Sequence, residues 1–241
     1  MIGNLDRVFA LQGEKITQDS ISDVIKIEHN NIYYYVKRYS SAGKGLKRFF
    51  GKPRVRGEWE NLQWFSQFGI PTADIVAYGL EKKWGFFKRG AVITQEIPNT
   101  KNLADLATER RLLNNLTVKT ISEQLAECTR ILHAHGFIHN DLKWRNVLVD
   151  NQNKVYLIDC PVGDFWRGQL LSYRMIKDLK TLDNHAKKYL TRTQRLRFFL
   201  TYIGGQKLTA ESKLFLLRLL TRRSRRYDKQ SNLSLLFTKR Y

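Results

Sequence analysis

A chain of 241 residues, 42% of them hydrophobic, is long enough to bury a core in one domain or two small lobes, and its composition excludes a disordered protein. The 42 Lys and Arg residues against 22 Asp and Glu leave a formal charge of +20, which predicts an anionic partner: nucleic acid, anionic lipid or a phosphorylated glycan. No apolar run approaches the roughly 20 residues that span a bilayer, and no signal peptide is predicted, so we expect a soluble cytosolic protein. The two cysteines, Cys128 and Cys160, make neither a disulfide framework nor a zinc site, and we expect them to be reduced, buried thiols.

The first third of the sequence predicts strands and one helix. Runs rich in β-branched and aromatic residues predict strands over 23–28, 32–37 and 90–97. The first two flank His29-Asn-Asn31, a hairpin-like connection. A helix over 54–67 is predicted because Leu62 and Phe65 follow Glu58 at helical spacing.

The remainder is mainly helical. A 3.6-residue apolar repeat predicts a helix with a capping box at Thr120-x-x-Glu123 and a stop at Gly136. Two short strands follow over 146–149 and 154–158, and then basic amphipathic helices broken at Gly204-Gly205. From Arg167 onward there are 19 basic and 4 acidic residues, so +15 of the +20 lies there and the anionic partner is expected at the C-terminal part.

This order of elements predicts an α+β fold with two lobes. The N-terminal lobe, residues 1–97, is a small antiparallel sheet with one helix. The C-terminal lobe, residues 98–241, is mainly helical and carries a polar loop and the basic helices. We expect a hinge near residue 97.

The polar loop is the segment that points to chemistry. A helix leads into it, and it feeds a hydrophobic hairpin that ends in Asp159. Transfer of a phosphoryl group from ATP needs Mg²⁺ to neutralise phosphate oxygens and a carboxylate to orient the attacking hydroxyl. Asn146 and Asp159 can together supply the oxygen ligands that Mg²⁺ prefers, and Asp141 is free to receive the hydroxyl proton. The alternative is that Asp141 and Asn146 only form a turn and that Asp159 only caps a neighbouring element.

These residues resemble the protein-kinase-like superfamily. His139-x-Asp141-Leu-x-x-x-Asn146 is similar to its catalytic loop, and Asp159 stands where its metal-binding aspartate stands. The resemblance implies a bilobal kinase-like fold with ATP and Mg²⁺ as cofactors, Asp141 as a catalytic residue, and Asn146 and Asp159 as metal ligands.

The same resemblance implies a strand lysine that holds the α- and β-phosphates and a helix glutamate that holds the lysine. Lys37 and Glu58 occupy these places and are the further predicted catalytic residues; Lys37 also binds the nucleotide. Glu60 could replace Glu58, but it points about 200° away around the helix. Because Glu58 shares a face with Leu62 and Phe65, we choose Glu58.

Two segments depart from the kinase pattern. There is no G-x-G-x-x-G motif, so the candidate phosphate loop is residues 17–22, where backbone amides and the hydroxyls of Ser20 and Ser22 could meet phosphate and Asp19 would repel it. Cys160-Pro161-Val-Gly163 follows Asp159 in place of Phe-Gly, and no activation segment is recognisable. We therefore expect a constitutively assembled site.

Adenine is expected against the backbone of residues 95–97. Glu96 and Ile97 are accordingly predicted to bind the nucleotide, with Thr94 at the back of the pocket. Glu96 could equally be a solvated charge.

Five further side chains near the loop are assigned by position. His139 is expected to orient a neighbouring group or to pack, rather than to act as a base. His133 and His135 are expected to lie on the outside of a helix at its end. Trp144 and Arg145 either line the acceptor site or pack.

Within the superfamily the sequence is similar to the bacterial lipopolysaccharide kinases, the group that contains the core heptose kinases and the Kdo kinases. The similar features are Tyr35-Val-Lys37-Arg38, the Glu58 helix with Gly69-Ile-Pro71, residues 93–98, the 139–146 loop, Lys177-Asp178-Leu179 and residues 190–198. The resemblance covers roughly residues 20 to 205. It implies transfer of the ATP γ-phosphate to a hydroxyl of an inner-core sugar, heptose or Kdo. It also implies an anionic glycolipid partner, no specific nucleic acid, and a peripheral position on the cytoplasmic face of the inner membrane.

The positive charge agrees with a glycolipid at a membrane, where each Lys or Arg near an anionic bilayer contributes about 1 kcal/mol. Residues 44–56 are either a solvated loop or a contact for anionic substrate. Residues 214–226 predict a helix with an apolar stripe and a basic end, in which we expect buried leucines and exposed arginines.

Two other functions remain in competition. The acceptor could be a protein or a small molecule such as an aminoglycoside, although a cationic substrate fits poorly with a charge of +20. The chain could instead be an inactive kinase scaffold that binds nucleic acid. Against that, no dedicated nucleic-acid motif is present, and Lys37, Asp141, Asn146 and Asp159 are all in place.

Overall fold

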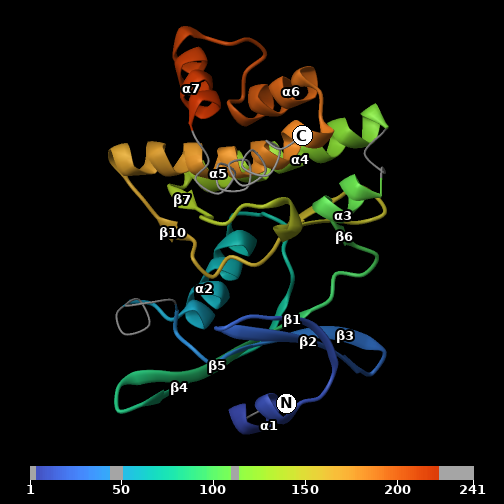
Figure 1. Cartoon of the computed structure of the whole chain (residues 1–241), viewed down its shortest axis with the longest axis vertical. Coiled ribbons are helices and arrows are strands. Elements are labelled where there is room, and N and C mark those ends of the chain that lie inside the picture. Colours follow the sequence, from blue (N-terminus) through green and yellow to red (C-terminus); the bar gives the residue numbers. More distant parts are fainter. Residues whose placement is uncertain (1–3, 44–50, 110–113, 223–241) are drawn as a thin grey trace, which may run out of the picture.

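The computed structural model describes residues 4–43, 51–109 and 114–222, which form an antiparallel sheet followed by a helical layer (Figure 1). The strands are β1 (Glu14–Gln18), β2 (Ser22–His29), β3 (Ile32–Tyr39), β4 (Ile75–Lys83), β5 (Phe86–Gln95), β6 (Lys101–Asn102), β7 (Phe137–Ile138), β8 (Val147–Val149), β9 (Val155–Leu157) and β10 (Asp164–Phe165). The helices are α1 (Leu5–Ala10), α2 (Arg54–Gln67), α3 (Leu103–Thr108), α4 (Asn115–Ala134), α5 (Gly168–Tyr189), α6 (Arg192–Tyr202) and α7 (Ala210–Thr221), with a 3₁₀ turn at Trp144–Asn146.

The large sheet has the strand order β1-β2-β3-β5-β4. The predicted hairpin is confirmed: β2 and β3 pair through Asn30 and Asn31, whose φ angles of 54° and 60° are ones that asparagine tolerates in two-residue turns. Two strands of this sheet were not predicted from the sequence. β1 is exposed along its whole length, and β4, an edge strand, has no fully buried residue, so neither shows a hydrophobic alternation.

The two faces of this sheet are covered by different helices. Val36 of β3 is fully buried in a cluster with Val8 of α1. Tyr39 faces the other way and packs with Val55 of α2. Because side chains alternate along a strand, Lys37 shares the face of Tyr39 and points to α2. The sequence pattern of β3 thus decides which helix can supply a partner for Lys37.

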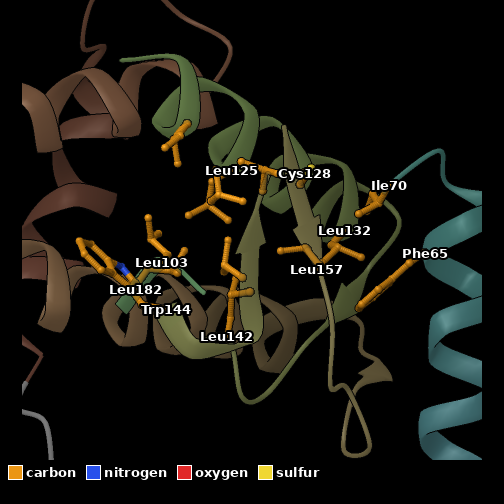
Figure 2. Packing of buried hydrophobic residues seen from close by; sticks show 14 of the residues in the cluster. Phe65, Ile70, Leu103, Leu125, Cys128, Leu132, Leu142, Trp144, Leu157 and Leu182 are labelled. Carbon is orange, nitrogen blue, oxygen red and sulfur yellow. The ribbon is translucent and has the colours of Figure 1, made fainter. Parts of the chain in front are cut away.

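Helix α2 also packs against the helical layer. Figure 2 shows Phe65 of α2 directed toward the cluster that contains Leu132 and Leu157. The Phe65 ring lies 5.8 Å from the Phe137 ring and 5.7 Å from that of His139, centroid to centroid. One helix therefore contacts both the sheet and the start of the polar loop.

The predicted start of the long helix was wrong, and its stop was confirmed. α4 begins at Asn115, and the Asn114 side chain caps it by accepting a hydrogen bond from the Leu116 amide (2.9 Å). Thr120 and Glu123 consequently lie inside the helix, because its buried face already starts at Val118. At the other end Gly136 has a φ of 71°, a left-handed conformation that favours glycine after a helix.

The predicted burial of the leucines in α7 was wrong for part of the stripe. Leu219 is buried, but Leu214, Leu217 and Leu220 are 58%, 56% and 47% exposed, because these three lie away from the side of α7 that packs on α5 and α6. Arg218 is exposed, as expected, whereas Arg222 is partly buried and lies over the Tyr173 ring. Residues 223–226 of this prediction, and 44–50 of the other basic segment, lie outside the described residues. Among the helices of the described chain, none combines the length and apolarity needed to span a membrane.

Candidate active site

Lys37 lies between two carboxylates. Its ammonium nitrogen is 2.8 Å from Oε2 of Glu58 and 2.5 Å from Oδ1 of Asp159. Glu58 is only 5% exposed and projects from α2 toward the sheet. Glu60 lies on another side of the helix and pairs with Lys52 at 2.7 Å. The structure thus places Glu58, and not Glu60, beside Lys37.

The charges of this cluster depend on one another. Burial alone would lower the pKa of Lys37, but the negative charge of Glu58 in particular raises it well above its ordinary value. Burial raises the pKa of Glu58, and Lys37 opposes this shift. Burial would also raise the pKa of Asp159, but Lys37 holds it below its ordinary value. Tyr39, whose hydroxyl donates a hydrogen bond to Glu58, was not predicted from the sequence.

Asp141 and Asn146 lie together at the end of the loop. The Asn146 side-chain amide donates to the Asp141 backbone carbonyl (2.9 Å) and lies 3.5 Å from its carboxylate. Lys143, which sequence reasoning left unassigned, places its ammonium 2.5 Å from Oδ1 of Asp141. The Asp141 carboxylate is one-third exposed and can be reached by a substrate.

Asn146 and Asp159 are neighbours across the β8–β9 hairpin. The Ile158 amide donates to the Asn146 carbonyl (3.0 Å), so the next residue, Asp159, lies beside the loop. Asp159 has a φ of 58° and a side chain that is 39% exposed. An amide oxygen and a carboxylate are hard oxygen donors that suit Mg²⁺. Within the described ranges no group of three or more His, Cys, Asp or Glu side chains is arranged to hold a metal ion.

Asp178 anchors the loop from behind. This α5 residue is 1% exposed, and its carboxylate accepts hydrogen bonds from the backbone amides of His139 (2.8 Å) and Asn140 (3.3 Å). Sequence reasoning missed this role, although the signal was present: Asp178 interrupts an apolar stripe between Ile176 and Leu179. A buried carboxylate in such a stripe indicates a fixed hydrogen-bond partner.

The three histidines near the loop have different surroundings. His139 is fully buried against Phe65, and burial lowers its pKa, so it packs as a neutral ring, as expected. His135 is exposed at the helix end. His133 was wrongly predicted to decorate that end: it is 4% exposed, and its Nδ1 lies 2.8 Å from the Tyr202 hydroxyl.

A second α2 side chain holds the segment after Asp159. The Asn61 amide donates to the carbonyls of Cys160 (2.7 Å) and Gly163 (3.0 Å). Gly57, one turn earlier, comes so close that an added Cβ would lie 2.5 Å from the Pro161 carbonyl oxygen. α2 therefore carries Glu58 and is packed tightly on the strand end that carries Asp159.

We expect Gly57→Ala to be destabilising although alanine is the better helix former. The helix propensity gain of about 1 kcal/mol is opposed by the contact with the Pro161 carbonyl, and overpacking of this kind costs about 1–3 kcal/mol. Thermal unfolding should show a lower Tm, and any phosphotransfer should fall because α2 must move. Gly205→Ala is the matched control, since its Cβ would meet only ordinary contacts at 3.5 Å or more. A raised Tm for Gly57→Ala would contradict the tight packing.

The candidate phosphate loop is already hydrogen-bonded internally. The Asp19 carboxylate accepts from the amides of Ile21 (2.7 Å) and Ser22 (2.8 Å). A phosphate would have to compete with Asp19 for these donors. The contact of Ser20 and Ser22 with nucleotide stays a prediction.

Glu96 at the predicted hinge is engaged on two sides. Its carboxylate accepts hydrogen bonds from Lys26 (2.7 Å) and the Tyr35 hydroxyl (3.2 Å), and its amide donates to the Tyr33 carbonyl (2.8 Å). Any contact of Glu96 with adenine must therefore come from its carbonyl oxygen. The nucleotide contact of Ile97 stays a prediction.

Trp144 packs in the core and does not line an open acceptor site. It is 3% exposed and stacks with His185 and Tyr189. Behind it, an apolar cavity of about 400 Å³ lies among α4, α5, α6 and α7, and neither Lys37, Asp141 nor Asp159 borders it. The cavity is thus separate from the carboxylate cluster.

Comparison with known proteins gives one family match. Residues 10–202 match the family model described as "Lipopolysaccharide kinase (Kdo/WaaP) family". A solved structure described as "WaaP in complex with acyl carrier protein" is similar with a TM-score of 0.70 over 89% of this chain and 88% of that chain, at 21% sequence identity. At that identity the likeness concerns the fold, which is kinase-like.

Curated relatives match at low identity. The 3-deoxy-D-manno-octulosonic acid kinase of Vibrio cholerae is 28% identical over 123 residues, which cover 45% of this chain and 50% of the relative. A probable serine/threonine-protein kinase of fowlpox virus is 24% identical over 164 residues, which cover 68% of this chain and 51% of the relative. The chain thus spans about half the length of these two relatives.

Proposed function

Because this chain belongs to the lipopolysaccharide kinase (Kdo/WaaP) family, a kinase family that uses ATP, we propose that it transfers the γ-phosphate of ATP to a sugar hydroxyl of the lipopolysaccharide inner core, a heptose or Kdo. The observation that carries the proposal is the meeting of Lys37, Glu58 and Asp159 beside the Asp141–Asn146 loop. These groups come from the sheet, α2 and the helical layer, and together they match the requirements of phosphoryl transfer.

We assign each side chain a role that its surroundings support. Lys37, kept charged by Glu58, holds the α- and β-phosphates of ATP. Asp141 accepts the proton of the attacking hydroxyl and orients that hydroxyl toward the γ-phosphate. Lys143, 2.5 Å from Asp141, lies where it can neutralise charge on the transferred phosphate. Asn146 and Asp159 would hold Mg²⁺, which when bound neutralises phosphate oxygens.

A cluster of positive charge beside the loop supports an anionic acceptor. Burial lowers the pKa of His185, and the charges of Lys188, Arg145 and Lys143 lower it further, so all three cations lie close enough to act on this ring. We call Lys143, Arg145 and Lys188 the acceptor-side cations. Lys143 reaches Asp141 directly, so a phosphate or carboxylate on the acceptor could bind the cluster while its hydroxyl meets Asp141. This favours an anionic glycolipid over a cationic small molecule.

The acceptor can be tested by kinetics on matched substrates. We expect Arg145→Ser to raise KM for a lipopolysaccharide acceptor about tenfold, a loss equivalent to one charge-assisted hydrogen bond, while KM for ATP changes little. Added salt should weaken the wild type more than the variant because exposed charges are screened. Lys207→Ser is the control, because Lys207 is an exposed cation in the connection between α6 and α7, outside this cluster.

Two outcomes would reject the acceptor assignment. Equal labelling of a generic protein and of lipopolysaccharide would favour a protein acceptor. The fowlpox virus relative is described as a probable serine/threonine-protein kinase, which acts on such an acceptor. Tight binding of nucleic acid without any phosphotransfer would favour an inactive scaffold.

Peripheral contact with the inner membrane, which would bring the enzyme to its glycolipid, remains part of the proposal and is supported by the charge of +20.

A further inference from the structure

The hairpin between β4 and β5 presents two aromatic side chains to solvent. Lys83 and Phe86 are cross-strand partners, so the connection is a two-residue turn of Trp84 and Gly85. Trp84 is 88% exposed and Phe86 is 62% exposed. Among the large apolar side chains in the described chain that are exposed, Trp84 is the most accessible.

The backbone of this turn does not favour tryptophan. Trp84 has a φ of 52° and Gly85 a φ of 82°, the left-handed pair for which Asn-Gly is the preferred sequence. A bulky residue in this region is strained by about 1 kcal/mol. The β2–β3 hairpin, by contrast, uses Asn30 and Asn31 for the same kind of turn.

Among the described residues, the surroundings of Trp84 offer little to offset that strain, because the side chain is 88% exposed. The ammonium of its neighbour Lys83 lies over the Trp84 ring, 5.2 Å from the ring centroid. With most of its surface in water, the side chain gains little from burial. A strained and exposed tryptophan indicates a contact outside the folded chain.

The surroundings of the two aromatic rings are basic. Residues 81–89 contain four basic residues and one acidic residue. Lys82, Lys83 and Lys88 are exposed, and the acidic residue, Glu81, pairs with Lys88 (2.6 Å). Lysines with long apolar stems around tryptophan and phenylalanine are the composition that binds the headgroup region of an anionic bilayer.

We propose that the β4–β5 hairpin inserts Trp84 and Phe86 into the interface of an anionic membrane. The hairpin projects from one end of the sheet, which lies on the opposite side of the molecule from α6 and α7 (Figure 1). Two aromatic side chains can bury roughly 300–500 Å², which is less than the roughly 800 Å² per partner of a stable protein interface. A projecting tip of this size suits a lipid surface, where lysines add electrostatic attraction.

The position of the hairpin on β5 gives the contact a geometric consequence. The strand runs from Phe86 at the tip to Gln95 next to the predicted hinge, about 30 Å away at the usual rise per residue. A membrane held at the tip would therefore orient the candidate site without covering it. This inference does not depend on which acceptor is phosphorylated.

The turn offers a variant that separates binding from folding. Trp84→Asn creates the favoured Asn-Gly turn, so its Tm should equal or exceed that of the wild type. Its affinity for vesicles of phosphatidylglycerol and phosphatidylethanolamine should fall about tenfold, since loss of one inserted aromatic ring corresponds to about a decade of affinity. Val76→Thr, an exposed apolar residue at the other end of β4, is the matched control and should bind as the wild type does.

Vesicle sedimentation measures the binding, and quenching of tryptophan fluorescence by lipids brominated in their acyl chains measures insertion. We expect quenching in the wild type that is absent in Trp84→Asn, and weak binding of both to phosphatidylcholine vesicles. Unchanged affinity of Trp84→Asn for anionic vesicles, or no binding of the wild type, would overturn the proposal. Neither measurement uses ATP, so a failure here is distinct from a failure of the proposed kinase function.

Discussion

Asp141→Asn is expected to lower kcat for phosphotransfer by about two to four orders of magnitude, the usual contribution of a positioned general base. Asparagine has the same shape but cannot accept the proton of the attacking hydroxyl. The hydrogen bond from the Asn146 amide to the residue-141 backbone carbonyl (2.9 Å) does not depend on the carboxylate and should persist. The fold and the affinity for ATP should therefore change little.

Steady-state kinetics and calorimetric titration with ATP distinguish these effects. Glu127→Gln is the control, because Glu127 is a carboxylate of α4 that pairs with Arg130 at the surface, away from the loop. Its kcat should stay at the wild-type value. An Asp141→Asn enzyme with unchanged turnover would remove Asp141 from its proposed role.

Lys37→Met should abolish nucleotide-dependent activity and also destabilise the protein. Glu58 and Asp159 would face each other without the ammonium that lies 2.8 Å and 2.5 Å from them. Removing one partner of a buried ion pair costs about 3 kcal/mol or more, because the remaining charge is left uncompensated. Chemical denaturation should show this loss at neutral pH.

A second substitution and a pH series test the physical cause. Lys37→Met/Glu58→Gln should recover part of the stability, without activity, because one of the opposed charges is gone. In Lys37→Met alone, the pKa of Glu58 should rise further, since burial and Asp159 already raise it and Lys37 opposes them. A native carboxylate with a raised pKa binds more protons than the unfolded chain, so the stability deficit should shrink as the pH falls. A deficit independent of pH would mean that packing, and not charge, is responsible.

Part of the geometry around Lys37 is set by two short-range periodicities that can be followed in the sequence. Alternation along β3 sends Lys37 to the face of Tyr39, and the helical repeat of α2 sends Glu58 and Phe65 to a buried side. Asp141 and Asn146 belong to one short polar loop before a hydrophobic hairpin, so the sequence also predicted that they lie close together. These local placements needed only neighbours a few residues away, whereas the meeting of Lys37 with Glu58 and Asp159 was implied by the resemblance to the protein-kinase-like superfamily.

The partners of several buried polar side chains lie far away in the sequence and could not be predicted. Asp178 has a defined role only because the fold brings α5 behind His139, 39 residues earlier in the chain. The burial of His133 likewise requires Tyr202, which is 69 residues away. Edge strands such as β4 lack the alternation that marks a half-buried strand. Such contacts arise from tertiary packing, which a single sequence does not display.

The most direct test of the proposed function is to locate the phosphate itself. The protein is incubated with Mg²⁺, ATP labelled at the γ-phosphate and lipopolysaccharide from a strain that lacks core phosphate, and the glycolipid is then fragmented by mass spectrometry. We predict one new phosphate on an inner-core heptose or Kdo, absent when Asp141→Asn replaces the wild type. Label that remains in ATP, or that appears on protein while the glycolipid stays unmodified, would contradict the proposed function.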